Sequence, residues 1–108
     1  MQKILHLVLK KRWFDMFASG DKTEEYREVK PHWQRIFANG LIKIGGIYHN
    51  PESVIVCFSH GYRKNRPQLY FRCRGLEVRN GRPSWGAEPG KKYFVIKIGE
   101  TISEINAQ

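Results

Sequence analysis

The stretch Gly20-Asp21-Lys22-Thr23-Glu24-Glu25-Tyr26-Arg27 stands between a predicted helix and a predicted strand. Aromatic and apolar residues recur at helical spacing over residues 12–19, and Gly20 follows where a left-handed residue commonly ends a helix. Residues 22–29 include β-branched and aromatic side chains, which predicts a strand leaving the turn. The stretch therefore turns into a strand and brings several charged side chains close to one end of the predicted sheet.

Outside this junction the hydrophobic pattern predicts mostly β-structure. Short runs that alternate apolar and polar side chains are typical of strands with one buried face. We predict strands over residues 4–10, 53–59, 68–78 and 93–98, a second helix over 31–38, a turn at Asn80-Gly81 and a tail over 102–108. Residues 42–48 are compatible with either an edge strand or a loop. The predicted fold class is α+β, a small β-barrel of about five to six strands in a mixed sheet with two short helices near its mouth.

The length and composition indicate one globular domain. With 108 residues, 41% of them hydrophobic, the chain is too short for two stable cores and too apolar for a disordered protein. Its apolar runs fall short of the roughly 18 residues that a membrane helix needs, and its N-terminus lacks the pattern of a signal peptide. We therefore expect one domain over residues 1–108, a cytoplasmic location and no membrane contact.

The charge of the chain is high and unevenly distributed. Nineteen Lys and Arg against ten Asp and Glu give a net charge of +9. Residues 57–82 hold a single acid, Glu77, and the cations Arg63, Lys64, Arg66, Arg72, Arg74, Arg79 and Arg82. Surfaces of this kind attract polyanions, and nucleic acid is their usual partner.

The cysteines and histidines do not indicate a metal or cofactor site. Cys57 and Cys73 lie in apolar, strand-like runs without the spacing of a zinc site, and the four histidines are scattered singly. Free cysteine packs as a small hydrophobic residue, so we expect two buried thiols. No metal and no cofactor are expected.

Four positions of the opening stretch match a known signature. The spacing G-x-K-x-x-E-x-R is met by Gly20, Lys22, Glu25 and Arg27. In this spacing, and in its position after a strand and a short aromatic helix, the chain resembles the ASCH domain, an RNA-associated relative of the PUA domain. Three further segments resemble the compact bacterial and phage branch of that family: Gly61-Tyr62, Trp85-Gly86-Ala87 and residues 94–100. The resemblance implies a PUA-like barrel that binds RNA or a nucleotide.

The residue types of the signature suit a ligand pocket. Arg27 offers a planar fork for a phosphate or a base edge, and Lys22 offers a point charge at the turn. Glu25 could orient Arg27 or accept hydrogen bonds from the amino group of a base. The predicted ligand-binding residues are Gly20, Lys22, Glu25, Tyr26 and Arg27. The alternative is a solvated ladder of ion pairs, with Glu25 paired to Arg27 and Lys22 paired to Glu24.

Aromatic residues interleaved with cations predict a second contact surface. Aromatic rings stack on bases while nearby cations hold the phosphate backbone. The predicted nucleic-acid contacts are Arg63, Lys64, Arg66, Tyr70, Arg72, Arg74 and Trp85. Trp13 and Trp33 lie at helical spacing with apolar neighbours, and we predict that they are core residues.

An enzyme is the alternative to a binding module. One branch that the chain resembles consists of amidohydrolases that remove an acyl group from a modified cytidine, and other family members are proposed ribonucleases. In an enzyme Lys22 and Glu25 would be the catalytic residues, although the amidohydrolase branch has threonine where Glu25 stands. Glu77 and Glu88 are the candidates for its distant carboxylate, and no paired histidines are visible. Catalysis needs a lowered Lys22 pKa, whereas adjacent carboxylates favour the ammonium form, so we prefer binding.

Overall fold

The structure is a computed structural model that describes residues 3–105, with side chains described for residues 3–102. A strand, a helix, a strand and a second helix are followed by strands alone, apart from two short 3-10 turns. The helices are α1 (Lys11–Ser19) and α2 (Pro31–Gln34), and the turns are η1 (Pro51–Ser53) and η2 (Pro83–Trp85). The strands are β1 (Lys3–Leu9), β2 (Glu24–Glu28), β3 (Phe37–Ala38), β4 (Leu41–Ile44), β5 (Ile47–His49), β6 (Val54–His60), β7 (Gln68–Asn80) and β8 (Lys92–Ile105).

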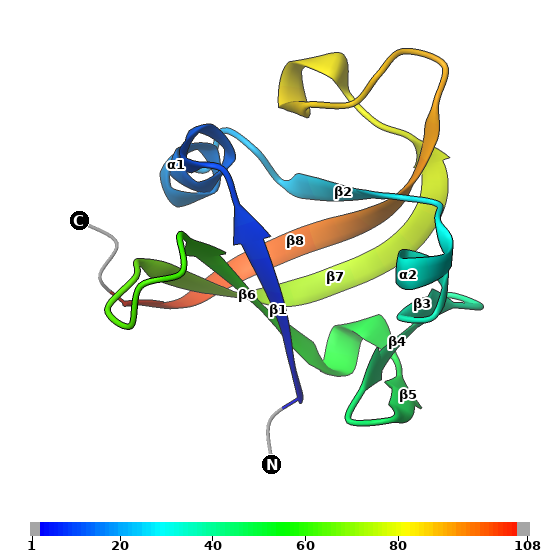
Figure 1. The fold of residues 1–108 in the computed structure, drawn as a ribbon, viewed down its shortest axis with the longest axis horizontal. Helices are drawn as coiled ribbons and strands as arrows, with labels where there is room; N and C mark the ends of the chain where they lie inside the picture. The colour runs from blue at the N-terminus through cyan, green and yellow to red at the C-terminus, as the bar shows by residue number, and fades with distance from the viewer. Residues whose placement is uncertain (1–2, 106–108) are drawn as a thin grey trace.

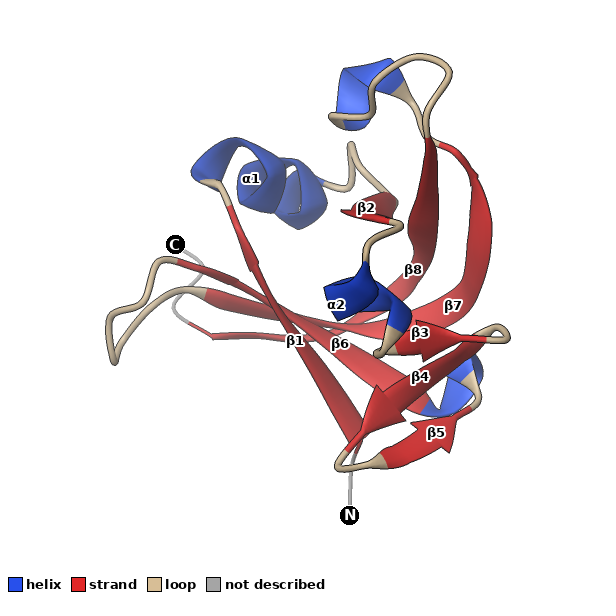
Figure 2. Cartoon of the chain, turned by 45° about the vertical axis from the view of Figure 1, so that its right-hand side comes forward, coloured by secondary structure: helices blue, strands red, loops and turns tan. Residues whose placement is uncertain are grey.

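Five of the strands form one curved sheet in the order β1-β6-β7-β8-β2 (Figure 1). β1 runs parallel to β6, and the other neighbouring strands are antiparallel. The sheet curls into a half-barrel whose edge strands are β1 and β2, while β3, β4 and β5 form a small sheet below α2 (Figure 2). The chain therefore has the predicted α+β fold, with a five-stranded mixed half-barrel sheet and two helices.

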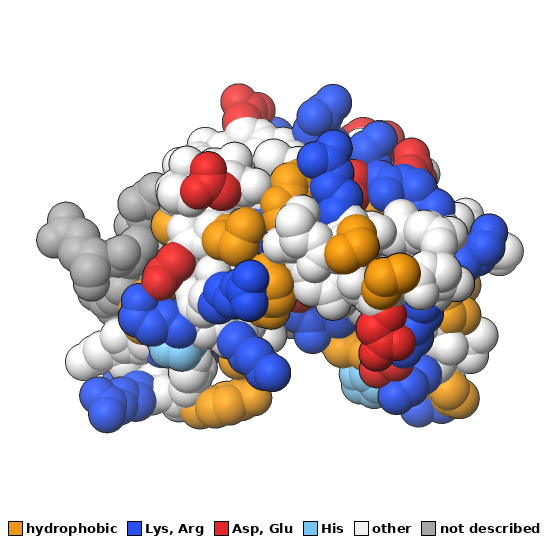
Figure 3. Space-filling view, turned by 90° about the horizontal axis from the view of Figure 1, so that it is seen from above, with side chains coloured by type: hydrophobic (Ala, Val, Ile, Leu, Met, Phe, Trp, Pro, Cys, Tyr) orange, Lys and Arg blue, Asp and Glu red, His pale blue; other side chains and the backbone are white. Residues whose placement is uncertain are grey.

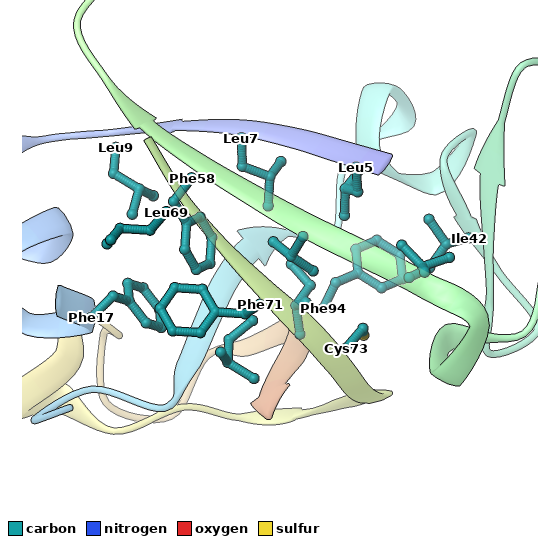
Figure 4. Close-up of a cluster of buried hydrophobic side chains, with 14 of the residues drawn as sticks. Leu5, Leu7, Leu9, Phe17, Ile42, Phe58, Leu69, Phe71, Cys73 and Phe94 are labelled. Carbon is teal, nitrogen blue, oxygen red and sulfur yellow. The ribbon is translucent and has the colours of Figure 1, made fainter. Parts of the chain in front are cut away.

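The inner face of the half-barrel carries the core, as the alternating pattern predicts. In β1 and in the first half of β7, buried residues alternate with more exposed ones. Side chains from β1, β6, β7 and β8 meet around the rings of Phe17, Phe58 and Phe71 (Figure 4). The Phe17 ring of α1 stacks on Phe58 with ring centroids 4.2 Å apart, so the core fixes α1 against the sheet.

The first helix ends as predicted. Gly20 has a φ of 85°, in the left-handed region, and its N–H donates to the Phe17 carbonyl at 3.2 Å. The N–H of Lys22 then donates to the Met16 carbonyl at 3.1 Å, which folds the turn back against the helix. α1 has nine residues, and no helix within residues 3–105 is long and apolar enough to cross a membrane.

The second helix is shorter than predicted. We predict one helix over residues 31–38, but α2 is a single turn and Phe37–Ala38 form β3. The cause is Asn39-Gly40, whose φ values of 54° and 74° make a tight turn that pairs β3 with β4. Gly45-Gly46, with φ values of 61° and 82°, turns β4 into β5, so residues 42–48 belong to a hairpin.

The Asn80-Gly81 pair does not make the predicted tight turn. β7 continues through Asn80, and β8 begins only at Lys92, so residues 81–91 form a longer connection that contains η2. A Cβ added to Gly81 would lie 2.7 Å from both the Tyr26 ring and the Ala87 side chain. Glycine is therefore needed here for close packing rather than for a left-handed turn.

The last strand is longer than predicted. We predict a strand over residues 93–98 and a tail over 102–108, but β8 spans Lys92–Ile105. Its final residues pair with the start of β7, which supplies the backbone partners that a free tail would lack. Residues 106–108 of the predicted tail lie outside the described residues.

Candidate functional site

Lys22 lies buried beside the end of α1, with 3% of its surface exposed. Its Nζ donates to the carbonyl oxygen of Trp85 at 2.8 Å and lies 3.0 Å from Oε1 of Glu25. The same nitrogen lies 4.2 Å from the centre of a Trp13 ring, which is a cation–π distance. Lys22 therefore joins α1, β2 and η2, three elements that are separate in the sequence.

Glu25 and Arg27 share one face of β2, as the period of a strand predicts. Glu25 is 6% exposed, and its Oε2 accepts a hydrogen bond from Nη2 of Arg27 at 2.8 Å. Nη2 of Arg27 also donates to the carbonyl oxygen of Val8, on β1, at 3.4 Å. Because β1 and β2 are the edges of the half-barrel, Arg27 bridges its open side. We call these three connected side chains the Lys22–Glu25–Arg27 array.

Two tryptophans contact the cations of the array. Trp13 lies against Lys22, and the centre of the Trp33 ring is 5.0 Å from Cζ of Arg27. Both rings also pack against the hydrophobic core, as predicted, although each is only partly buried. Trp33 stacks on Phe37 with centroids 5.9 Å apart, so core packing fixes the ring that Arg27 contacts.

The array is more enclosed than a ladder of surface ion pairs. The Glu25–Arg27 pair of that alternative is present, but Glu24 pairs with Arg79 instead of Lys22. The side chain of Arg27 is 18% exposed, yet its buried Nε has no hydrogen-bond partner among the described residues. The array therefore pairs its charges internally and retains an unmatched donor at the Arg27 end.

Burial lowers the pKa of Lys22 below its ordinary value of 10.5. Contact with Glu25 raises this pKa and nearby Arg27 lowers it, but desolvation is the largest effect. Glu25 favours the ammonium form, as expected of an adjacent carboxylate, but burial outweighs its effect. The array thus holds a lysine that loses its proton more readily than a lysine in water.

Tyr26, also predicted to bind ligand, points to the opposite face of β2. Its hydroxyl donates to Oε1 of Glu24 at 2.8 Å and accepts from the N–H of Arg82 at 3.0 Å. The ring packs in a small second cluster with Ala87 and Tyr93. Desolvation is the main reason that the pKa of Tyr26 rises to about 12. The structure therefore separates Tyr26 from Glu25 and Arg27.

Gly20 lies beside a cavity of about 300 Å³ between α1 and strands β7 and β8. Lys22 and Thr23 line this cavity with Gly20, and Phe71 and Gly99 line it from the sheet. The pairing of β7 with β8 shifts register around Phe71, and such bulges often occur beside functional sites. Gly20 and Lys22 thus border this cavity, whereas Arg27 reaches toward β1.

The connection 81–91 supports the array in a way that sequence reasoning missed. Gly86 has a φ of 101°, and an added Cβ would lie 2.9 Å from the Trp13 ring. The ring of Trp85, a predicted nucleic-acid contact, lies 4.4 Å from Cζ of Arg82, while its carbonyl receives Lys22. The tripeptide Trp85-Gly86-Ala87 is the part of the sequence that could have indicated this contact, because glycine permits both a left-handed φ and close approach to a ring.

The β6–β7 loop, residues 61–67, carries charge that no described acid compensates. Within residues 3–102, no Asp or Glu lies within ion-pair distance of Arg63, Lys64 or Arg66. The loop encloses a cavity of about 450 Å³ whose lining includes His60, Arg63 and Arg66. Tyr62, also in the lining, is 87% exposed.

This loop and the array flank the same end of β1. Figure 3 shows the surface hollowed between the part that carries the β6–β7 loop and the part that carries α2. His60, at the start of the loop, pairs with Leu9, and its Nδ1 lies 3.3 Å from the Leu9 carbonyl oxygen. The preceding residue, Val8, accepts the hydrogen bond from Arg27.

The other predicted nucleic-acid contacts lie on the outer face of β7. Tyr70, Arg72 and Arg74 alternate with buried core residues, so they share the face that points away from the core. Arg72 pairs with Glu100 at 3.4 Å. The structure therefore divides the predicted basic surface between the β6–β7 loop and this outer stripe.

The remaining candidates lie apart from the array. Cys57 and Cys73 are free and buried, as predicted, and burial raises the pKa of both thiols. In the part of the chain that the structure describes, no cluster of His, Cys, Asp or Glu could hold a metal ion. Glu77 pairs with Arg79 and Lys97 rather than with Lys22, and the backbone N–H of Glu88 donates to the Tyr93 hydroxyl.

Comparison with known proteins gives a partial match. No family model matches the chain, and no solved structure matches it. The chain is similar to part of a glucose-6-phosphate isomerase from Fusobacterium nucleatum, with 31% identity over 78 residues. The match covers 62% of this chain but only 17% of the isomerase, which is too little of that enzyme to show a family.

Proposed function

We propose that this chain is an ASCH-type, PUA-like domain that binds RNA or a nucleotide. The observation that carries the proposal is the Lys22–Glu25–Arg27 array, in which the charged positions of the signature meet at the open side of the half-barrel. A purely structural ion pair with Glu25 would not need Nη2 of Arg27 to reach the opposite edge strand as well. An unpaired base or its phosphate, entering between β1 and β2, would meet this guanidinium.

The unmatched donor on Arg27 supports a ligand at this place. A buried donor without an acceptor costs about 1–3 kcal/mol. Nε of Arg27 is such a donor among the described residues. A small reorientation of the guanidinium toward an acceptor on a ligand, such as a carbonyl or phosphate oxygen, would remove this cost and favour binding.

Binding of RNA to an Arg27 variant and to a matched control tests the proposal. The probe is a short fluorescein-labelled single-stranded RNA of mixed sequence, measured by anisotropy as salt rises from about 50 to about 200 mM. Arg27→Lys keeps the charge but loses the fork, and we expect it to weaken binding by about tenfold or more. Arg35→Lys is the control, because Arg35 is an exposed arginine with no side-chain ion pair among the described residues.

The outcomes separate the array from general electrostatic attraction. If Arg27→Lys binds as tightly as the wild type, the array is not the binding site. If the wild type does not bind RNA even at low salt, and binds no mononucleotide, the proposed function is refuted.

A small hydrolase is the second candidate, and the lowered pKa of Lys22 favours it. A lysine in its neutral form could take a proton from water that attacks the amide carbonyl of an N4-acylcytidine, giving cytidine and the free carboxylic acid. Against this, Nζ of Lys22 is already held by Trp85 and Glu25. Incubation with N4-acetylcytidine and chromatography for cytidine tests it, and turnover that survives in Lys22→Met would remove Lys22 from the reaction. Release of shorter products from the labelled RNA would indicate the ribonuclease alternative.

A further inference from the structure

We infer that the β6–β7 loop is a phosphate-binding subsite. The ligand is then a nucleotide or a single-stranded RNA rather than a free nucleoside. The inference rests on the proposed function and deepens it. Of the two basic surfaces, the β6–β7 loop and the outer stripe of β7, the loop contacts the ligand, and it binds a phosphate group.

The first support is the distribution of compensated charge. On the outer face of the sheet, Arg72 is matched by Glu100 and Arg79 by Glu24 and Glu77, and only Arg74 of the outer stripe has no acidic partner within residues 3–102. In the β6–β7 loop, by contrast, none of the cations has an acidic partner within residues 3–102. Uncompensated cations at one place raise the local potential, so an incoming anion gains most at the loop.

The second support is the shape of the loop. Gly61, with a φ of 80°, turns the chain out of β6. The backbone N–H of Arg66 donates to the Arg63 carbonyl at 3.2 Å, and Nη1 of Arg66 lies 3.3 Å from the same oxygen. This closed turn brings the two arginines together on one cavity of about 450 Å³, within the size range of small-ligand sites.

The third support is an aromatic ring with little to pack against. Tyr62 is 87% exposed and borders the same cavity as Arg63 and Arg66. An exposed ring beside arginines offers a stacking face for a base while the guanidinium groups bind phosphate. A free nucleoside could use the ring but would leave both guanidinium groups without an anion.

The position of the loop links it to the array. His60 and Arg27 contact the carbonyls of Leu9 and Val8, two successive residues at the end of β1. A single strand could therefore place one unpaired base at the array and its neighbouring phosphate at the loop. A duplex could not, because its bases are paired and stacked.

Two double variants with a charge-matched control test the inference. Arg63→Gln/Arg66→Gln removes two charges from the loop, Arg72→Gln/Arg74→Gln removes two from the outer stripe, and Lys43→Gln/Lys92→Gln removes two exposed charges elsewhere. The probes are the labelled single-stranded RNA, the same RNA as a duplex, and the four ribonucleosides with their 5′-monophosphates. Circular dichroism and thermal unfolding show that each variant is folded.

We expect the loop variant alone to lose affinity for the single strand and the monophosphates, by about tenfold or more. Its salt slope should fall by about 1.4, the value for two lost phosphate contacts on a single strand. The wild type should bind monophosphates more tightly than nucleosides, and the single strand more tightly than the duplex.

The inference is overturned if the loop variant binds like the wild type, or if either other double variant loses as much. Equal affinity for nucleosides and monophosphates also overturns it, and so does preference for the duplex. Failure of the proposed function can be distinguished from failure of the loop subsite by the wild type and the Arg27→Lys variant. If the wild type binds neither RNA nor any monophosphate, both fail; if the loop variant loses binding while Arg27→Lys does not, the loop subsite stands without the array.

Discussion

Nζ of Lys22 donates a hydrogen bond to the carbonyl oxygen of Trp85, at 2.8 Å and across 63 positions of sequence. This contact ties the turn after α1 to the connection between β7 and β8. Glu25 supplies the opposite charge at 3.0 Å, so the ammonium group is buried with a carboxylate and a carbonyl as partners. The lysine of the signature therefore has a structural role whatever else it does.

Replacing Lys22 by methionine should destabilise the fold. Lys22→Met removes one partner of a buried ion pair and leaves the Trp85 carbonyl without its donor, so we expect a loss of about 3 kcal/mol in the free energy of unfolding. Lys11→Met is the control, because the Lys11–Asp15 pair is exposed, at 72% and 55%, and should contribute less than about 0.5 kcal/mol. Urea denaturation measures both variants, and equal losses would contradict a structural role for Lys22.

The stability of the chain should depend on the protonation of Lys22. Burial lowers the pKa of Lys22 in the folded chain, so between that pKa and 10.5 the unfolded chain binds more protons. The free energy of unfolding therefore rises with pH over this interval. The wild type should gain stability relative to Lys22→Met as the pH approaches 10.5. Parallel curves for the two proteins would show that the Lys22 pKa is not lowered.

Gly86 should be intolerant of a side chain. Its φ of 101° disfavours any L-residue, and an added Cβ would also meet the Trp13 ring at 2.9 Å. Gly90→Ala is the matched control, since Gly90 has a φ of 77° but open space around the added Cβ. The control should cost about 1–2 kcal/mol for its backbone alone. Gly86→Ala should cost more and should also change tryptophan fluorescence, because it displaces Trp13. Equal costs would contradict the contact.

Local patterns in the sequence predicted those parts of the site that lie within a single strand or at the end of a single helix. The period of a strand places Glu25 and Arg27 on one face of β2, and Gly20 ends α1 as a left-handed glycine should. The Lys22–Trp85 contact has no such pattern, because its partners come from elements that only the curvature of the sheet brings together. The direction of the Lys22 pKa shift could not be predicted from the sequence for the same reason, since burial is a property of the folded chain.

The two Asn-Gly pairs show that this dipeptide alone does not predict a tight turn. Asn39-Gly40 makes a tight turn with both φ values positive, whereas the equivalent Asn80-Gly81 remains near the end of β7. Both pairs have the same sequence signal. The difference lies at Gly81, which is not in the left-handed region and onto which Tyr26 and Ala87 pack closely. Tertiary packing therefore decides that the tight turn forms at Asn39-Gly40 and not at Asn80-Gly81.

Tyr26 should make the chain sensitive to alkaline pH. Its pKa rises to about 12 from an ordinary value of 10.0, mainly through burial. The unfolded chain therefore loses this proton first, so the contribution to stability is complete below pH 10 and is lost as the pH rises toward 12. Tyr26→Phe removes this titration and the hydrogen bonds to Glu24 and Arg82.

Tyr26→Phe should therefore be less stable than the wild type near neutral pH, by about 1–2 kcal/mol, and should lose less stability above pH 10. Tyr62→Phe is the matched control, because Tyr62 is 87% exposed and should leave the free energy of unfolding unchanged near neutral pH. Denaturation curves at neutral and alkaline pH measure both effects, and tyrosinate absorbance follows the ionisation itself. If Tyr26→Phe and the wild type lose stability in parallel above pH 10, the hydroxyl is not buried as the structure has it.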